Sequence, residues 1–312
     1  ASPLSVDLDF VRTAVAAGLG AVVLPSVFEE QLVAEQLAVH RYFDARTDHD
    51  AEARSFVASS QMFSVGIEPA LRQLQRVQAA VDVPVIASLN GTSPGGWIEY
   101  AGALQQAGAA AIELNLYDIA TDPEESAGTI EDRQIAVVTS VCREVSVPVA
   151  VKLSAAYTAL PAFVRRLQGA GARGVVLFNR LYQPDVDLDT LDLVRHLPGV
   201  SEAVLPLRLH ALSILHGQCD LDLAASGGIC NGEGAAKAIV CGATAVQAVS
   251  ALYAGGPRAV ADLLTALQQR LHSLGYRHLD ECRGALSLRK AADPRHWERL
   301  NYAATLRGWK DG

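Results

Sequence analysis

Short runs of apolar residues, separated by longer amphipathic stretches, recur along the whole chain. The runs cover residues 21–24, 83–89, 111–116, 147–153, 174–178, 220–225 and 245–249. Continuous rather than alternating apolar residues indicate strands that are buried on both faces, and such strands form parallel sheets covered by helices. The pattern therefore predicts seven strands that alternate with helices.

Glycine marks the boundary between a helix and the next strand at several points. Gly18, Gly108, Gly171 and Gly242 each follow a helical stretch and precede an apolar run. Glycine is favoured just past the C-terminus of a helix because it adopts positive φ without strain. These four positions therefore support the predicted alternation of helix and strand.

Seven strands are one short of the closed (β/α)8 TIM barrel that this alternation indicates. The first helix, capped by Asp7 or Asp9, follows almost at once after Ala1. We therefore expect the first strand of the barrel to be truncated or to lie upstream of Ala1, because removal of a methionine alone would leave the barrel open. Residues 1–312 are expected to form a single barrel domain. In it, 275–312 would be a C-terminal helical extension and 44–64 an exposed polar insertion.

Charge and cysteine usage narrow the classes of partner. The net charge of −8 argues against nucleic acid or an anionic membrane as the main partner. No apolar run approaches the ~18 residues that a membrane span requires. The five cysteines lack the spacing of metal or cluster ligands and predict buried thiols in a reducing cytoplasm. We expect a cytoplasmic protein that binds a small molecule and no metal.

The last two strand ends are the most informative part of the chain. Gly227 and Gly228 follow the strand that ends at Ser226, and Ser250 and Ala251 follow the next strand. Active sites of (β/α)8 barrels lie at the C-terminal strand ends, and the last two loops often bind phosphate through backbone N–H groups. A lone glycine pair would be an ordinary tight turn, but the two strand ends together favour a phosphate site.

A lysine and two asparagines lie at other strand ends. Lys152 lies within the end of its strand, where a buried ammonium needs a negative partner; the alternative is a lysine that reaches solvent at the rim. Asn115 and Asn179 carry amides that suit the edge of a heteroaromatic ring, although each alone is more often a turn residue. Glu113 could pair with Lys152 or form a structural ion pair. With the phosphate site, these residues predict a long, flat, anionic cofactor.

These motifs resemble the dihydroorotate dehydrogenase superfamily of FMN-dependent barrels, over nearly the whole chain, and its dihydroorotate dehydrogenase-like branch in particular. The resemblance is carried by residues 112–116 (Ile-Glu-Leu-Asn-Leu), 148–154 (Pro-Val-Ala-Val-Lys-Leu-Ser), 225–229 (Ala-Ser-Gly-Gly-Ile) and 242–250 (Gly-Ala-Thr-Ala-Val-Gln-Ala-Val-Ser). It implies FMN as the cofactor. The implied cofactor contacts come from Ser2, Ser26, Asn90, Asn115, Lys152, Asn179, Gly227, Gly228, Ser250 and Ala251, the last four of them at the phosphate.

The resemblance also implies an activity, the oxidation of a CH–CH bond, as in the conversion of dihydroorotate to orotate in pyrimidine biosynthesis. Lys152 would lie beside the flavin N1 and C2 carbonyl and stabilise the charge of the reduced ring. The substrate would be contacted by Asn115, Asn179 and Tyr117. Besides this small molecule, the implied partners are a second copy of the chain and a redox partner protein.

The substrate half of the implied site departs from the family pattern. Typical soluble members continue after Glu-Leu-Asn with Ser-Cys-Pro-Asn, whose cysteine is the base, whereas residues 117–120 here are Tyr-Asp-Ile-Ala. Asp118 is therefore the expected base, with a solvated loop carboxylate as the alternative. Ser154, Arg180 and Arg208 are further candidates for the substrate side, and a surface ion pair explains Arg208 equally well.

Two other functions fit the same motifs. A tRNA-dihydrouridine-type reductase shares the barrel and the flavin, but the net charge of −8 and the lack of a basic C-terminal domain count against it. A non-catalytic flavin-binding subunit of a redox complex is favoured by the altered substrate residues. Lys152 counts against that reading, because a subunit without catalysis has no need of a buried cation beside the ring.

Overall fold

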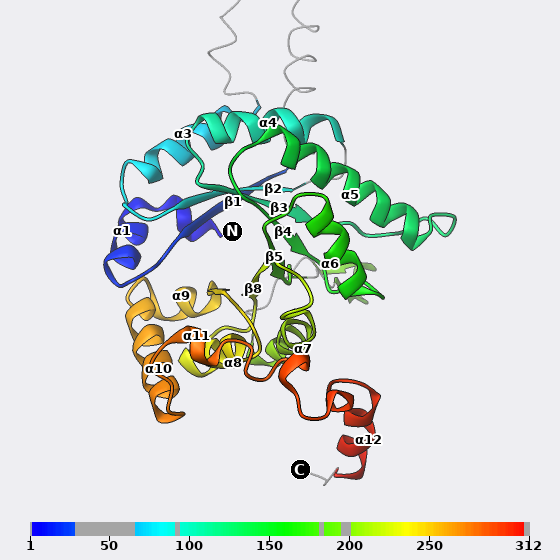
Figure 1. Cartoon of the computed structure of the whole chain (residues 1–312). Helices are drawn as coiled ribbons and strands as arrows, with labels where there is room; N and C mark the ends of the chain where they lie inside the picture. Colours follow the sequence, from blue (N-terminus) through cyan, green and yellow to red (C-terminus); the bar gives the residue numbers. More distant parts are fainter. Residues whose placement is uncertain (1, 29–65, 91–93, 181–183, 195–200, 309–312) are drawn as a thin grey trace, which may run out of the picture. The chain divides into compact units, whose positions relative to one another are not determined.

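A computed structural model describes residues 2–28, 66–90, 94–180, 184–194 and 201–308. The polar insertion expected over 44–64 lies outside the described residues. Contacts divide the chain into two compact units, residues 1–150 and 151–312. Figure 1 shows their helices and strands coloured along the sequence.

All seven predicted strands are present and form one sheet in the order β1-β2-β3-β4-β5-β8-β9. Their bounds are β1 (Val22–Phe28), β2 (Val85–Asn90), β3 (Ala111–Leu116), β4 (Val149–Leu153), β5 (Gly174–Leu177), β8 (Asp222–Ser226) and β9 (Ala245–Gln247). The pairs β1–β2, β2–β3, β5–β8 and β8–β9 are parallel. Since helices separate these strands along the chain, the fold is that of a (β/α)8 barrel, seven of whose strands lie among the described residues.

The helices follow the strands as the apolar pattern predicts. The first unit contains the 3-10 helix η1 (Pro3–Val6), α1 (Leu8–Ala16), α3 (Glu68–Gln78), α4 (Pro94–Gln106) and α5 (Ala127–Glu144). The second contains α6 (Leu160–Gly169), α7 (Leu205–Leu215), α8 (Gly232–Val240), α9 (Ser250–Gly255), α10 (Ala259–Ser273), α11 (Leu279–Cys282) and α12 (Arg299–Arg307). Asp7 caps α1, as expected, by accepting hydrogen bonds from two backbone N–H groups.

The helix-ending glycines adopt the predicted conformation. Gly18, Gly108, Gly171 and Gly242 have φ values of 105°, 100°, 104° and 119°. Each follows a helix and precedes a strand of the main sheet. These positions therefore require a residue that tolerates positive φ.

The end of β1 differs from the prediction. The apolar run places the strand end at Pro25 and Ser26, but β1 continues to Phe28. Its register with β2 shifts between Val23 and Ser26. Proline is tolerated at such an irregularity because no ladder hydrogen bond is required of its nitrogen. Ser26 therefore lies inside the strand rather than at its end.

Two further elements depart from the prediction. β9 ends at Gln247, two residues before the expected Val249, and α9 begins at Ser250. An antiparallel hairpin, β6 (Asp185–Asp187) with β7 (Asp192–Val194), was not predicted. Its strands are short and largely exposed, so they lack the continuous apolar run that identifies the other strands.

The segment after α10 packs back onto α8. Gly284 N donates to Ile239 O at 3.1 Å, and Leu286 N donates to Val240 O at 2.8 Å. Cys282 is fully buried in the same hydrophobic cluster as Ile239. The C-terminal segment therefore completes both the carbonyl hydrogen bonds at the end of α8 and the core beside it.

The described residues contain no helix that is both long and apolar enough to cross a bilayer. The five cysteines are all free thiols, and two of them, Cys241 and Cys282, are buried. Burial raises the pKa of both of these thiols. They are therefore packing residues rather than reactive nucleophiles.

Candidate active site

In the first unit, polar side chains lie toward the C-terminal ends of three neighbouring strands. Ser88 and Asn90 of β2 pair in register with Glu113 and Asn115 of β3, and all four are buried. Ser26 of β1 pairs with Ser88, and their Oγ atoms are 2.7 Å apart. Residues two apart on a strand share a face, so these five side chains lie on one face of this part of the sheet.

Asn115 carries an unsatisfied polar atom at this face. The residue is 7% exposed, and its Oδ1 atom has no hydrogen-bond partner within the part of the chain that the structure describes. Leaving a buried acceptor unpaired costs about 1–3 kcal/mol. The position therefore fits a donor from a bound ligand, and the ligand-binding role of the amide at 115 stays a prediction.

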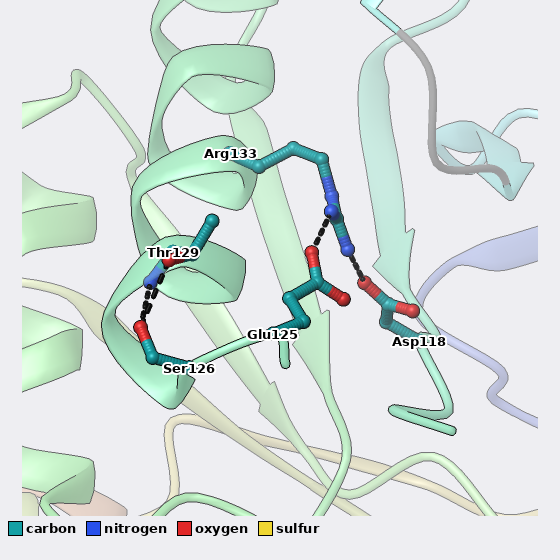
Figure 2. A network of polar contacts seen from close by, with 5 residues as sticks. All are labelled: Asp118, Glu125, Ser126, Thr129 and Arg133. Atoms are coloured by element: carbon teal, nitrogen blue, oxygen red, sulfur yellow. Dashed lines mark hydrogen bonds and ion pairs between the residues drawn. The ribbon is translucent and has the colours of Figure 1, made fainter. Parts of the chain in front are cut away.

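The loop after β3 is tied to α5 by an ion-pair network (Figure 2). Arg133 Nη2 donates to Asp118 Oδ2 at 2.6 Å, and Arg133 Nη1 donates to Glu125. The hydrogen bond that Arg133 donates to Asp118, followed by the one that it donates to Glu125, raises the pKa of Arg133. The Asp118 side chain is only 19% exposed, so Asp118 is not a solvated loop carboxylate.

Two further residues, one at each end of this loop, form hydrogen bonds that involve the backbone. Ser126 caps α5, because Thr129 N donates to Ser126 Oγ at 3.1 Å (Figure 2). Tyr117 N donates to Asn115 O at 3.1 Å, and the Tyr117 side chain is half-buried. The chain from β3 to α5 is therefore anchored at both ends.

In the second unit, Lys152 lies inside the end of β4 as predicted. It is 6% exposed, and its Nζ atom donates to Gln247 Oε1 at 3.1 Å. A lysine that reaches solvent at the barrel rim is therefore the wrong reading. Gln247 was not predicted as a site residue; its place at the end of the last strand, three residues before Ser250, was the available signal.

The turn after β8 has the geometry expected for a phosphate-binding loop. Gly227 and Gly228 have φ values of +93° and +82°. A Cβ atom at Gly228 would lie 2.9 Å from the backbone N of Leu205, and one at Gly227 would lie 3.1 Å from Arg208 Nη2. Both glycines are therefore required by conformation and by space, and their N–H groups are not shielded by side chains of their own.

Arg208 does not form the surface ion pair that was one of the two readings of its sequence position. It is 8% exposed, and it donates from Nε to Ser226 O at 3.0 Å and from Nη1 to Val204 O at 2.9 Å. Burial lowers the pKa of this guanidinium. The expected surface ion pair is therefore wrong, because Arg208 binds main-chain carbonyls inside the fold.

The remaining candidates occupy strand ends or helix starts. Ser250 and Ala251 are the first residues of α9, and Ser2 Oγ accepts from Leu4 N at 3.3 Å as the cap of η1. Asn179 N donates to Leu153 O at 2.7 Å, and Asn179 Oδ1 accepts from Arg180 N at 2.9 Å. The Asn179 amide NH2 is therefore the group left for a ligand. Within the second unit, register pairing also places Ser226 beside Gln247.

A model of the dihydroorotate dehydrogenase family matches residues 46–271, which is well over half of the chain. The chain belongs to the dihydroorotate dehydrogenase family. This membership confirms the resemblance of its motifs, and proteins of this family are FMN-dependent oxidoreductases.

Curated relatives agree with this membership in the dihydroorotate dehydrogenase family. A putative dihydroorotate dehydrogenase A (fumarate) from Aeropyrum pernix is 30% identical over 227 residues, which are 70% of this chain and 72% of the relative. The catalytic subunit of a dihydroorotate dehydrogenase B (NAD(+)) from Desulforudis audaxviator is 31% identical over 229 residues, 70% of this chain and 73% of that subunit. The dihydroorotate dehydrogenase from Eimeria tenella, solved with ferulenol, has a TM-score of 0.56 at 16% identity and covers 70% of this chain and 68% of its own, which supports the fold alone.

The residues of this dihydroorotate dehydrogenase family member fit FMN on physical grounds. The Gly227–Gly228 turn after β8 has backbone N–H groups with no Cβ beside them and positive φ at both residues, as in loops that bind phosphate. Lys152 supplies a buried ammonium in the same unit. The cofactor assignment thus agrees with the chemistry of the side chains.

Proposed function

We propose that this protein oxidises a CH–CH bond of dihydroorotate or a close analogue, with FMN as the electron acceptor in the site. The observation that carries the proposal is the Gly227–Gly228 turn after β8, where both glycines adopt positive φ and α7 packs closely against them. Ser250 and Ala251 would supply the second set of N–H groups, at the start of α9.

Lys152 is the residue that we propose to stabilise negative charge on a reduced ring. Its ammonium is buried, so its field is weakly screened, and Gln247 fixes its direction through a 3.1 Å hydrogen bond. Bound FMN would supply the hydride-accepting chemistry of the reaction. The ammonium would then offset the charge that develops beside N1.

Asp118 would take the proton from the carbon adjacent to the one that loses hydride. Arg133 holds its Oδ2 atom, and Oδ1 carries no hydrogen bond to a described residue, so one oxygen remains available. A base whose orientation is fixed by a third group is a common catalytic arrangement. Asn115, Tyr117 and Asn179 are proposed to hold the substrate, while Ser2, Ser26 and Asn90 are proposed as further cofactor contacts.

The final electron acceptor distinguishes two kinds of enzyme that would fit this proposal. The relatives are named for fumarate in one case and for NAD(+) in the other. We propose the protein to be a cytoplasmic homodimer that uses one of these acceptors, directly or through a redox partner protein. Five free cysteines are in keeping with a reducing compartment. Light scattering of the purified protein tests the dimer.

A visible spectrum of the purified protein tests the proposal. A flavin spectrum is expected, and anaerobic addition of dihydroorotate should bleach it. Reoxidation by fumarate or by NAD(+) then identifies the acceptor. A colourless protein that takes up no added FMN would overturn the cofactor assignment. A yellow protein that dihydroorotate does not bleach would keep FMN and remove this substrate.

A further inference from the structure

We infer that Arg208 is a positioning residue for the phosphate-binding turn: it fixes the peptide group between Ser226 and Gly227 so that the Gly227 N–H points toward the anion. The inference rests on the proposed binding of the FMN phosphate at Gly227 and Gly228. It adds a residue of α7 to a site that the strand ends alone had defined.

The carbonyl of Ser226 is held from two directions. Arg208 Nε donates to it at 3.0 Å, and Phe178 N donates to it at 3.1 Å. In a trans peptide the C=O and the following N–H point in opposite directions. Holding Ser226 O toward Arg208 therefore turns the N–H of Gly227 away from Arg208, where a ligand can accept it.

The guanidinium is itself fixed in place. Nη1 donates to Val204 O at 2.9 Å, and the Arg208 Cζ atom lies 5.8 Å from the centre of the Phe178 ring. Arginine presents its donors in a rigid planar fork, so two carbonyls at fixed positions determine the orientation of the whole group. Arg208 therefore acts as a brace between the start of α7 and the end of β8.

The charge of Arg208 also favours an anion at the turn. No carboxylate pairs with Arg208 among residues 2–28, 66–90, 94–180, 184–194 and 201–308. A hydrogen bond from a cation polarises the accepting peptide group and makes its N–H a stronger donor. The burial that lowers the pKa of Arg208 is consistent with a cation that lacks a counter-charge until an anion binds.

The glycine turn is shaped to admit this guanidinium. An ideal Cβ at Gly227 would approach Arg208 Nη2 to 3.1 Å and Nε to 3.4 Å. One turn earlier on α7, Leu205 packs against Gly228 in the same way, within 3.0 Å of a Cβ there. Since residues three apart share one face of a helix, a single face of α7 supports both glycines.

A purely structural role for Arg208 makes different predictions. If Arg208 were only structural, its replacement would lower the stability of the fold and would reduce the affinity for FMN and for riboflavin by the same factor. A role at the phosphate affects FMN but leaves riboflavin unaffected, because riboflavin has the same ring and lacks the phosphate. The ratio of the two affinities therefore separates the two roles.

The experiment measures dissociation constants of FMN and of riboflavin for the apo-protein by flavin fluorescence. Arg208→Met should raise the FMN dissociation constant about tenfold to a hundredfold, as expected for a lost charge-assisted hydrogen bond. Its riboflavin dissociation constant should stay at the wild-type value. Arg208→Lys keeps the charge but lacks the planar guanidinium. Its FMN dissociation constant should therefore lie between those of the wild type and of Arg208→Met. Arg289→Met is the matched control, because Arg289 also donates to a main-chain carbonyl, that of Gly217 at 3.2 Å.

Several results would overturn the inference. They are wild-type FMN affinity in Arg208→Met, or an equal loss of affinity for both flavins. Thermal unfolding of each apo-variant shows whether it is folded. If Arg208→Met does not fold, the two affinities are compared in Arg208→Lys instead. That variant must then lose affinity for FMN while it keeps its affinity for riboflavin. A wild-type protein that binds no FMN at all would instead overturn the proposed function, whatever the variants do.

Discussion

Lys152 and Arg208 are buried cations with different partners and different tasks. Lys152 donates to the side-chain amide of Gln247, whereas Arg208 donates to main-chain carbonyls of Val204 and Ser226. An ammonium with three rotatable donors can keep its protein partners and still face a ligand, but a planar guanidinium fixed at two carbonyls is suited to bracing the backbone. The first is therefore a candidate catalytic residue and the second a positioning residue.

Replacing Lys152 tests its catalytic role. Lys152→Ala should slow flavin reduction by dihydroorotate about 10²–10³-fold, in the range seen when one preorganised donor to a developing charge is removed. The protein should stay yellow, because the phosphate site is intact. Stopped-flow absorbance under anaerobic conditions measures the rate. Gln247→Leu keeps the lysine and removes its amide partner, so a smaller loss of rate is expected. If the flavin of Lys152→Ala were reduced at the wild-type rate, Lys152 would have no catalytic role.

Asp118 and Glu125 provide a matched pair, because both bind the guanidinium of Arg133. If Asp118 is the base, Asp118→Asn should lower turnover about 10²–10⁴-fold. Glu125→Gln weakens the same network without touching the proposed base, so its turnover should stay close to wild type. Steady-state rates of the two variants decide the matter. Equal, small losses in both would make Asp118 an anchor of the loop rather than a base.

At the scale of elements, α7 contacts glycine positions at both of its ends. Its first residue, Leu205, packs on Gly228, and its C-cap, His216, lies against Gly242 and Gly284. Glycine allows these close approaches because it has no Cβ. Substitutions at Gly228 and at His216 can therefore test the two ends of α7 separately.

Gly228→Ala should disturb the phosphate turn. The new Cβ would meet the backbone of Leu205 at 2.9 Å, and φ is +82°, so a loss of about 1–3 kcal/mol of unfolding free energy is expected together with weaker FMN binding. Urea unfolding and flavin fluorescence measure both effects. Gly275→Ala has φ of +88° but nothing within 4 Å, so it separates strain from collision. FMN binding as in the wild type in Gly228→Ala would argue against the turn as the phosphate site.

His216 should make stability depend on pH. Burial, and then the charge of Lys290, lower its pKa against an opposing hydrogen bond to Gly242. The unfolded chain therefore binds a proton near the ordinary pKa of about 6.5 more readily than the folded protein. The unfolding free energy should fall as pH decreases below that value and should level off below the folded pKa.

Urea unfolding between pH 5 and 8 measures this dependence. His216→Asn should reduce the slope, because the titrating group is gone. His272→Asn, at an exposed position on α10, should keep the wild-type slope. An unchanged slope in His216→Asn would show that another group titrates.

Local signals account for what the sequence predicted correctly. Continuous apolar runs identified all seven strands of the main sheet. The glycines that end helices could be recognised from the residues next to them in the sequence. The extension of β1 past Pro25 depended on its pairing with β2, and the small hairpin β6–β7 has no apolar run.

The same limit applies to the candidate site. Lys152 and the glycine pair stand in recognisable local motifs, so their positions were predictable. The bonds from Arg133 to Asp118 and from Arg208 to Ser226 join residues 15 and 18 positions apart. Such contacts depend on how separate elements pack, and composition or spacing alone does not reveal them.

For the molecule as a whole, FMN should stabilise the folded state by mass action. At a free FMN concentration a hundred times the dissociation constant, the gain is about 2.7 kcal/mol. For a chain of 312 residues the midpoint of thermal unfolding should rise by roughly 4 °C. Differential scanning fluorimetry with and without FMN measures the shift. Gly228→Ala at the same FMN concentration is the control and should shift less; no shift in the wild type would contradict specific binding.

The hydrogen bonds from Gly284 and Leu286 to the last carbonyls of α8 have a consequence for any shortened version of this chain. The match to the family model ends at residue 271, before both donors. Ile239 and Val240 lie inside the matched region, but their carbonyls accept hydrogen bonds from outside it. A protein cut at the end of the match would therefore leave two carbonyls of α8 without these donors and would remove Cys282 from the cluster beside them.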